Sequence, residues 1–249
     1  MINLVTIDPS INSTGLTING EVFSIASESI ALTKSLKLNK WFQLCDDHAT
    51  IHTVDTSYFG IKEYAPLEII KLETYQKIAN LVRTLVDKHT NPEYNTLVLI
   101  EGYSYSSAAG PLIDLVTLST LIRRNLFSRR NTSLVVLAPQ SLKKLAGWLT
   151  YPAIAKGKKV VKYEYRNNQG KAAGSFDKFD IYTALTENTK IKTDWVEFLR
   201  EHQDEILKAK AVPKPIEDVN DAVTLMHIGQ KAIQEQPDIQ SVVSFLSYN

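Results

Sequence analysis

The chain has 249 residues, of which 44% are hydrophobic, and this is typical of a globular protein with one substantial core. Its formal net charge of +1 hides an uneven distribution, because lysines and arginines gather between residues 123 and 178 with few acids among them. A single cysteine excludes an internal disulfide, and the sequence contains neither a signal-peptide pattern nor an apolar run of the roughly 20 residues that span a bilayer. We therefore expect one intracellular domain, residues 1–249, with no membrane partner.

Three strand patterns open the chain, at residues 2–7, 14–19 and 21–26. The first ends at Asp8-Pro9, where proline cannot continue a hydrogen-bond ladder, so we expect a carboxylate at the end of a strand. The second and third are joined by Asn19-Gly20, a dipeptide that suits a tight hairpin because both residues tolerate positive φ. The chain should therefore begin as an antiparallel meander.

Helix and strand patterns alternate through the middle of the chain, which predicts an α/β fold. After a weakly patterned excursion from 27 to 64, in which we place only a strand at 50–54, the predicted elements are a helix at 66–88, a strand at 96–101, a helix at 111–127, a strand at 133–138 and a short helix at 139–146. The apolar run at 96–101 ends in Glu101, which puts a second carboxylate at a strand end. We expect Gly147 to stop the short helix.

The last third of the chain begins with residues 148–174, which are rich in Gly, Lys and Asn and lack periodicity, so we expect an exposed, mobile insertion. Helical patterns follow at 176–186, 193–208 and 216–234. On the final helix, Asp218 and Asp221 are three residues apart and should project from one face, with Glu217 and Asn220 pointing elsewhere.

These acids could form one site if the strands ending at Asp8 and Glu101 are neighbours and the last helix crosses their ends. Hard oxygen ligands select Mg²⁺ or Mn²⁺, and two such ions about 4 Å apart can activate water and stabilise the leaving oxygen in phosphodiester hydrolysis. Carboxylates packed this closely repel one another, so their pKa values should be raised and a bound metal should stabilise the fold.

Four segments resemble, in order and in position, motifs of RuvC-type Holliday junction resolvases: IDPSINSTG at 7–15, VLIEGYSYS at 98–106, VLAPQSLKKLAG at 136–147 and EDVNDAVTL at 217–225. The resemblance implies a ribonuclease H-like fold, with a mixed five-stranded sheet flanked by helices and with inserted loops near 27–64 and 148–174. It also implies that four acids are the catalytic residues and hold two Mg²⁺ ions, for which Mn²⁺ can substitute: Asp8, Glu101, Asp218 and Asp221.

The same resemblance extends to a glycine followed four residues later by lysine, found here as Gly174 and Lys178, and it implies that Lys178 contacts a phosphate. Where the family has Gln after the catalytic Glu and then an aromatic wedge, this chain has Gly102, with Tyr103 and Tyr105 as the available rings. The basic residues expected to contact DNA are Lys143, Lys144, Lys171, Arg123 and Arg124, although cations at a helix end also stabilise the helix.

We therefore expect a metal-dependent endonuclease that resolves four-way DNA junctions as a homodimer, because two equivalent strands call for two equivalent active sites. The expected location is the cytoplasm of a bacterium or of a virus-infected cell. A nuclease acting on flaps, forks or RNA–DNA hybrids fits the same acids, and a module that binds branched DNA without cutting it remains an alternative. An ATP-binding protein of the actin and sugar-kinase type would need glycine-rich phosphate loops in two repeated domains, and the sequence has neither.

Overall fold

The computed structural model describes residues 1–28, 36–56, 61–103, 109–156 and 162–248. The strands are β1 (Ile2–Asp8), β2 (Ser13–Ile18), β3 (Glu21–Ser27), β4 (Thr50–Val54), β5 (Asn95–Glu101), β6 (Thr132–Leu137), β7 (Ile154–Lys156) and β8 (Lys162–Glu164). The helices are α2 (Leu36–Cys45), α3 (Tyr64–His89), α4 (Ala109–Phe127), α5 (Pro139–Thr150), η2 (Ala173–Ser175), α6 (Lys178–Glu187), α7 (Asp194–Glu201), α8 (Gln203–Leu207), α9 (Ile216–Glu235) and α10 (Ile239–Tyr248).

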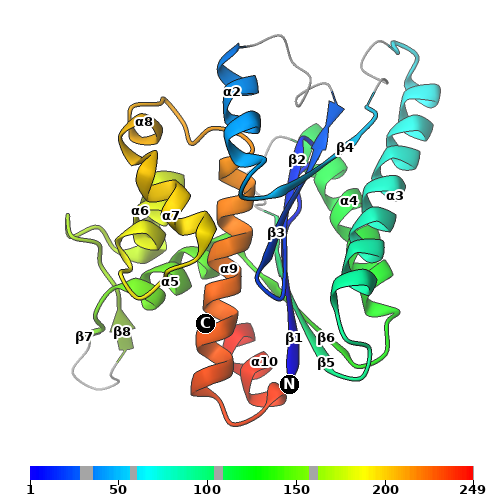
Figure 1. Cartoon of the computed structure of the whole chain (residues 1–249). Helices are drawn as coiled ribbons and strands as arrows, with labels where there is room; N and C mark the ends of the chain where they lie inside the picture. Colours follow the sequence, from blue (N-terminus) through cyan, green and yellow to red (C-terminus); the bar gives the residue numbers. More distant parts are fainter. Residues whose placement is uncertain (29–35, 57–60, 104–108, 157–161, 249) are drawn as a thin grey trace.

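A mixed sheet with the strand order β4-β3-β2-β1-β5-β6 forms the centre of the molecule (Figure 1). The first three strands are an antiparallel meander, whereas β5 runs parallel to β1, β6 parallel to β5 and β4 parallel to β3. The expected α/β class and the expected meander are thus confirmed. The sheet has six strands rather than the five that the resemblance implies, because the strand expected at 50–54 is present as β4 and pairs with the outer edge of β3.

The turn between β2 and β3 has the predicted geometry. Asn19 and Gly20 have φ values of 51° and 100°, in the left-handed region that Asn and Gly adopt most readily. The Asn19 side chain also binds the neighbouring strand, since its Oδ1 accepts a hydrogen bond from the backbone N–H of Leu4 at 2.9 Å. The turn residues therefore fix both the hairpin and its position beside β1.

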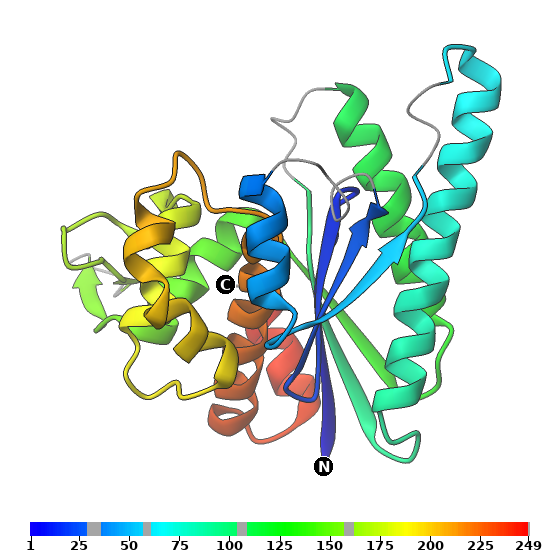
Figure 2. The ribbon, with the colours of Figure 1, turned by 45° about the horizontal axis from the view of Figure 1, so that its top comes forward.

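Helices cover both faces of the sheet, and strand periodicity decides which residue meets which helix (Figure 2). Val5 and Ile7 of β1 belong to the core formed with α3 and α4. Leu4 lies in the opposite core, which includes residues of α9. Because side chains alternate along a strand, Thr6 and Asp8 share the face of Leu4. The carboxylate at the end of β1 is therefore directed toward α9.

Three contacts hold α9 against the sheet. The Thr6 hydroxyl donates to the carbonyl of Ala222 at 2.6 Å. Farther along the helix, a Cβ on Gly229 would lie 2.9 Å from Leu4 Cδ1, so the missing side chain allows close approach. Near the start of the helix, a Cβ on Gly15 would lie only 2.1 Å from the carbonyl oxygen of Asp218. Since Gly15 is the β2 partner of Asp8, this close approach puts the first turns of α9 beside the end of β1.

Several expectations about element ends are wrong. Helix α5 continues past Gly147 to Thr150, and Gly147 is instead a packing contact, since its Cβ would lie 2.4 Å from that of Ala173. Residues 148–174, expected to be an exposed, mobile insertion, contain the end of α5, an antiparallel pair of strands and most of η2. Helices α2 and α10 were not expected. Among the described residues, no helix combines the length and apolar character needed to cross a membrane.

Candidate metal centre

Asp8 and Glu101 end two adjacent parallel strands. The register of β1 and β5 pairs Ile7 with Ile100, so the next residue of each strand is a carboxylate at the same edge of the sheet. Leu97 and Leu99 lie in the core on the α9 side, and Glu101 continues this alternation. Both side chains therefore face α9.

Helix α9 brings the third acid to this edge. One ligand oxygen from each of Asp8, Glu101 and Asp221 can be chosen so that all three lie within 4.8 Å of one another, which is the arrangement of a group that could hold a metal ion. Asp218 is one turn earlier on the same helix, also buried, but it is not a member of this group. The structure thus brings three of the four predicted acids together and places the fourth beside them on α9.

Burial raises the pKa values of all four carboxyl groups, and repulsion by neighbouring acids adds to the shift, as the sequence led us to expect. For Asp8 the main cause is burial, followed by the charge of Glu101. Burial and then the charge of Asp221 raise the pKa of Glu101 to about 7. Burial raises the pKa of Asp218 to about 6 although Lys214 opposes the shift, and it raises the pKa of Asp221 although Lys178 opposes it. The cluster therefore carries a cost that a bound cation would relieve.

Lys178 contacts this cluster directly, donating from Nζ to Asp221 Oδ2. Its position follows from local sequence, because Asp177 caps α6: the Asp177 side chain accepts from the backbone N–H of Asp180, and Asp180 accepts in return from that of Asp177. Burial alone would lower the pKa of Lys178, but the charges of Asp221, Asp8 and Glu101 raise it above its ordinary value. Lys178 is thus a charged donor at the rim of the cluster.

Lys214 and Glu217 belong to the site but were missed. Lys214 donates to Asp218 Oδ1, four residues along the chain, and lies 3.3 Å from Glu217 Oε2. Glu217 also lies 3.7 Å from Lys178, so the expectation that Glu217 points elsewhere is wrong. The sequence does contain a lysine four residues before an acid, but Lys214 lies before the expected start of the helix at residue 216. Lys214 explains why Asp218 is paired rather than directed at the other acids.

The donor set fits a hard divalent cation. All candidate ligand atoms are carboxylate oxygens, which suit such ions better than thiophilic metals. Glu101 Oε2 and Asp218 Oδ2 are buried and have no hydrogen-bond partner among the described residues. Buried oxygens without partners are costly, and a metal ion between them and the neighbouring acids would satisfy them.

The other residues predicted to contact DNA lie outside the acid cluster. Lys143 and Lys144 are on α5, and Arg123 and Arg124 on the second half of α4. Lys171 pairs with Asp177 at 2.8 Å and with Asp180. Of the basic residues predicted to contact DNA, and within the described ranges, only Lys178 contacts an acid of the cluster.

Of the two predicted rings, Tyr103 is described and Tyr105 lies outside the described residues. Tyr103 is half-buried two residues after Glu101, with the guanidinium of Arg123 at 5.9 Å from the centre of its ring. A cation at this distance is in contact range of the ring face. Tyr103 and Arg123 therefore lie together, although they come from different parts of the sequence.

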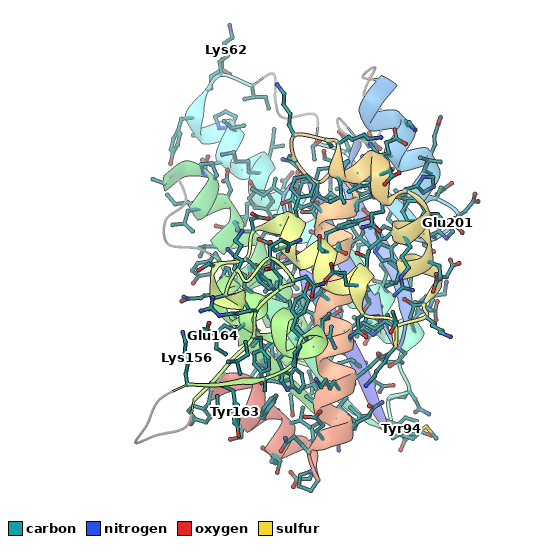
Figure 3. All side chains as sticks on the ribbon, turned by 90° about the vertical axis from the view of Figure 1, so that its left-hand side faces the viewer. Lys62, Tyr94, Lys156, Tyr163, Glu164 and Glu201 are labelled. Carbon is teal, nitrogen blue, oxygen red and sulfur yellow. The ribbon has the colours of Figure 1, made fainter. Side chains whose placement is uncertain are left out.

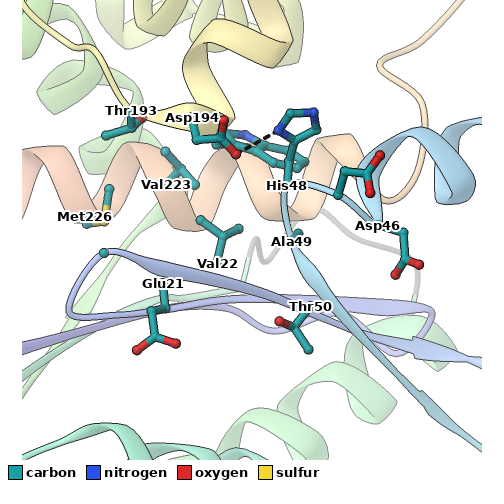
Figure 4. Close-up of a pocket in the computed structure, with 13 residues that line it drawn as sticks. Glu21, Val22, Asp46, His48, Ala49, Thr50, Thr193, Asp194, Val223 and Met226 are labelled. Atoms are coloured by element: carbon teal, nitrogen blue, oxygen red, sulfur yellow. Dashed lines mark hydrogen bonds and ion pairs between the residues drawn. The ribbon is translucent and has the colours of Figure 1, made fainter.

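A separate pocket of about 310 Å³ lies beside the outer strands, between the hairpin turn and α7 (Figure 4). His48 Nδ1 is 2.8 Å from Asp194 Oδ2 across this pocket, and the His48 ring stacks on Phe198 at 4.6 Å. These contacts tie the segment before β4 to α7. His48 and Asp194 therefore have a structural role, and this role is sufficient to explain why a histidine is paired with an acid here.

No protein-family model matches the chain, and the search of curated proteins finds no match either.

Proposed function

We propose that this protein is a metal-dependent, structure-selective DNA endonuclease with a ribonuclease H-like fold, related to RuvC-type Holliday junction resolvases. The convergence of Asp8, Glu101 and Asp221 from two neighbouring strand ends and one helix carries the proposal. The mixed sheet, in which a meander continues into strands parallel to β1, is compatible with such a fold. The four motif segments that resemble the resolvases include each of these acids.

The proposed cofactor is Mg²⁺, with Mn²⁺ able to substitute, and two ions per site. When bound, such ions supply an activated water and stabilise the leaving oxygen of a phosphodiester. Asp8, Glu101 and Asp221 would hold them, with Asp218 as a further ligand once it separates from Lys214. Lys178, which now pairs with Asp221, would turn to a phosphate oxygen when a cation takes over that carboxylate.

The negative charge of the acid cluster determines whether metal or DNA binds first. Buried acids in a group repel a phosphate, so the cluster alone should bind DNA poorly and bind it better after cations neutralise it. Lys178 and Lys214 lie at the border of the cluster and offer positive charge on that side. The arrangement therefore supports binding of metal first and of a phosphodiester second.

The proposed substrate is a four-way DNA junction, cut by paired nicks in a homodimer. The test incubates the purified chain with synthetic four-way junctions, flaps, forks, RNA–DNA hybrids and linear duplex, in Mg²⁺, Mn²⁺ or EDTA. We expect paired cleavage of the junction with metal only. Cleavage restricted to flaps, forks or hybrids would assign the same site to another substrate.

Two variants and one control link the activity to the acids. Asp8→Asn and Asp221→Asn keep the shape but remove a ligand charge, so each should lower the cleavage rate by at least about 100-fold. Asp204→Asn changes an exposed acid on α8 and should cleave like the wild type. Junction binding without cleavage in every metal would instead favour a non-catalytic binding module.

A further inference from the structure

A pocket of about 770 Å³ lies outside the acid cluster. It is formed by the second half of α5, the β7–β8 pair, the segment at η2 and the end of α10. Figure 3 shows Lys156, Tyr163 and Glu164 together on this side of the molecule, near α10. Its volume is in the range of small-molecule sites, which makes it large enough for an aromatic base.

Aromatic side chains make up much of the wall. Trp148 and Phe245 lie against each other with ring centres 5.3 Å apart. Lys231 fixes Trp148 from another side, with Nζ 4.0 Å from the ring centre and a 2.7 Å hydrogen bond to the Trp148 carbonyl. Tyr163 and Tyr248, by contrast, are 65% and 89% exposed. A fixed aromatic floor therefore lies next to two rings that are open to a ligand.

Positive charge surrounds these rings. Lys144 and Lys156 line the pocket together with one acid, Glu164. Glu164 pairs with both Lys156 and Arg166, so three cations are present for one carboxylate. Lys144 is exposed and forms no ion pair with any acid of the described segments. The pocket therefore combines apolar ring faces with an excess of positive charge, which suits a planar base attached to a phosphate.

The pocket is close to the acid cluster along the chain. Ala173 and Gly174 line the pocket, and Lys178, which contacts Asp221, is four residues after Gly174. Four residues extend at most about 14 Å, which corresponds to roughly four nucleotides of a stacked strand. One bound strand could thus reach both places.

From these observations we propose that this pocket binds an unpaired base of a DNA strand, stacked on Tyr163 and Tyr248, with its phosphates near Lys144 and Lys156. The inference rests on the proposed nucleic-acid function and adds a second contact to it. Base stacking on an aromatic ring needs no particular sequence, because every base has a π face. The pocket would therefore select unpaired nucleotides, such as those exposed at a branch point, over regular duplex.

The test measures binding without cleavage. The probe is a short oligothymidylate that carries one 2-aminopurine, whose fluorescence reports stacking. Its binding is compared with that of the same strand in a blunt duplex, and the buffer contains EDTA so that no DNA is cut. The full chain should bind the single strand more tightly than the duplex and change the 2-aminopurine signal. Tyr163→Ala and Tyr248→Ala should each weaken binding by roughly 5- to 100-fold and reduce that signal.

Matched variants separate stacking from charge and from folding. Tyr163→Phe keeps the ring and should bind like the wild type. Lys144→Gln should weaken binding and make it less dependent on salt, without removing the fluorescence change. Tyr94→Ala alters a half-buried tyrosine in the loop before β5, and Lys88→Gln alters an exposed lysine of α3. Both should bind like the wild type, and far-UV circular dichroism checks that all variants fold.

Equal binding by the wild type, Tyr163→Ala and Tyr248→Ala would overturn the inference, as would tighter binding of the duplex. A loss of self-association in Tyr163→Ala, seen by light scattering while oligonucleotide binding is unchanged, would make the surface a protein contact instead. Because the binding assay needs no cleavage, the two proposals can fail separately. If the chain stacks the base but never cuts DNA, only the nuclease proposal is refuted. If the chain cuts DNA but does not stack the base, only the pocket proposal is refuted.

Discussion

At the scale of single residues, Glu101 shows how a site prepared for a cation weakens the protein without it. Burial and then the charge of Asp221 raise its pKa from an ordinary value of 4.5 to about 7. Between these two values the folded chain binds more protons at Glu101 than the unfolded chain does. The free energy of unfolding therefore falls as the pH rises from 4.5 to 7, and this loss persists at higher pH.

Replacing Glu101 with glutamine should stabilise the metal-free protein. Glu101→Gln removes the buried charge and keeps the shape, so we expect a free energy of unfolding higher by roughly 1–3 kcal/mol at pH 8, with the difference shrinking as the pH falls toward 4.5. Urea unfolding in EDTA at several pH values measures this. Glu93→Gln, in an exposed loop, should unfold like the wild type at each pH. A less stable Glu101→Gln at pH 8 would contradict the account of repulsion.

The same pair of proteins should respond differently to metal. A ligand that binds the folded state raises stability in proportion to the logarithm of its concentration, so Mg²⁺ or Mn²⁺ should raise the unfolding temperature of the wild type. Glu101→Gln lacks one ligand oxygen charge and should respond much less. Without metal, Glu101→Gln should therefore unfold at the higher temperature. As metal is added, the unfolding temperature of the wild type should rise more and overtake that of the variant.

At the scale of elements, the placement of α9 depends on a residue that has no side chain. A Cβ on Gly15 would meet the backbone of Asp218 at 2.1 Å, and backbone cannot move aside as a flexible side chain can. Gly15→Ala should therefore push the start of α9 away from β2 and separate Asp221 from Asp8. The same change would disturb both the core and the metal group.

We expect Gly15→Ala to lower the free energy of unfolding by about 1–3 kcal/mol and to abolish the stabilisation by metal. Gly110→Ala provides the control, because a Cβ there meets nothing within 4 Å and alanine favours a helix. Thermal unfolding with and without Mn²⁺ distinguishes the two. If Gly15→Ala binds metal as well as Gly110→Ala does, the close approach of α9 is not what forms the site.

The elements that could be predicted are those whose pattern is local. A short, mainly apolar run that ends in an acid was sufficient to place β1 and β5, and the spacing of Asp218 and Asp221 was sufficient to place both on one helix. Convergence itself needed the resemblance, because no local pattern says which strands are neighbours. Gly147 was misread for a related reason: whether a glycine ends a helix or admits a neighbour depends on a distant residue, here Ala173.

Charge pairing inside the site was also beyond local patterns. Lys214, just before α9, and Glu217, in its first turn, pair with each other, and Lys214 also pairs with Asp218 of the acid cluster. The strand at 50–54 was expected, but its pairing with β3 as a sixth strand of the sheet could not be predicted from its local pattern. In each case the missing information is a long-range contact rather than a local preference.

At the scale of the whole molecule, exposed apolar side chains of the described residues gather on α3 and α4. Helices α3 and α4 lie side by side, and the part of α3 near its start carries apolar side chains that are exposed: Tyr64 at 79%, Ile69 at 60% and Leu72 at 52%. Ile113 on α4 is 62% exposed as well, and Lys71 joins the two helices through Asp114 at 3.2 Å. Apolar side chains gathered in this way are typical of protein interfaces.

A second copy of the chain is the partner that the proposed paired cleavage requires, and we expect it to bind on this surface. Ile69→Glu combined with Leu72→Glu should convert a dimer, of two 28.0 kDa chains, into a monomer in light scattering, because burying two new carboxylates is costly. Leu207→Glu, at a residue 43% exposed on α8, should remain dimeric. The monomeric variant should still bind metal but nick the two strands of a junction independently, so coupled cuts disappear. If the wild type is monomeric and still makes coupled cuts, paired cleavage does not need a dimer and the expected interface is wrong.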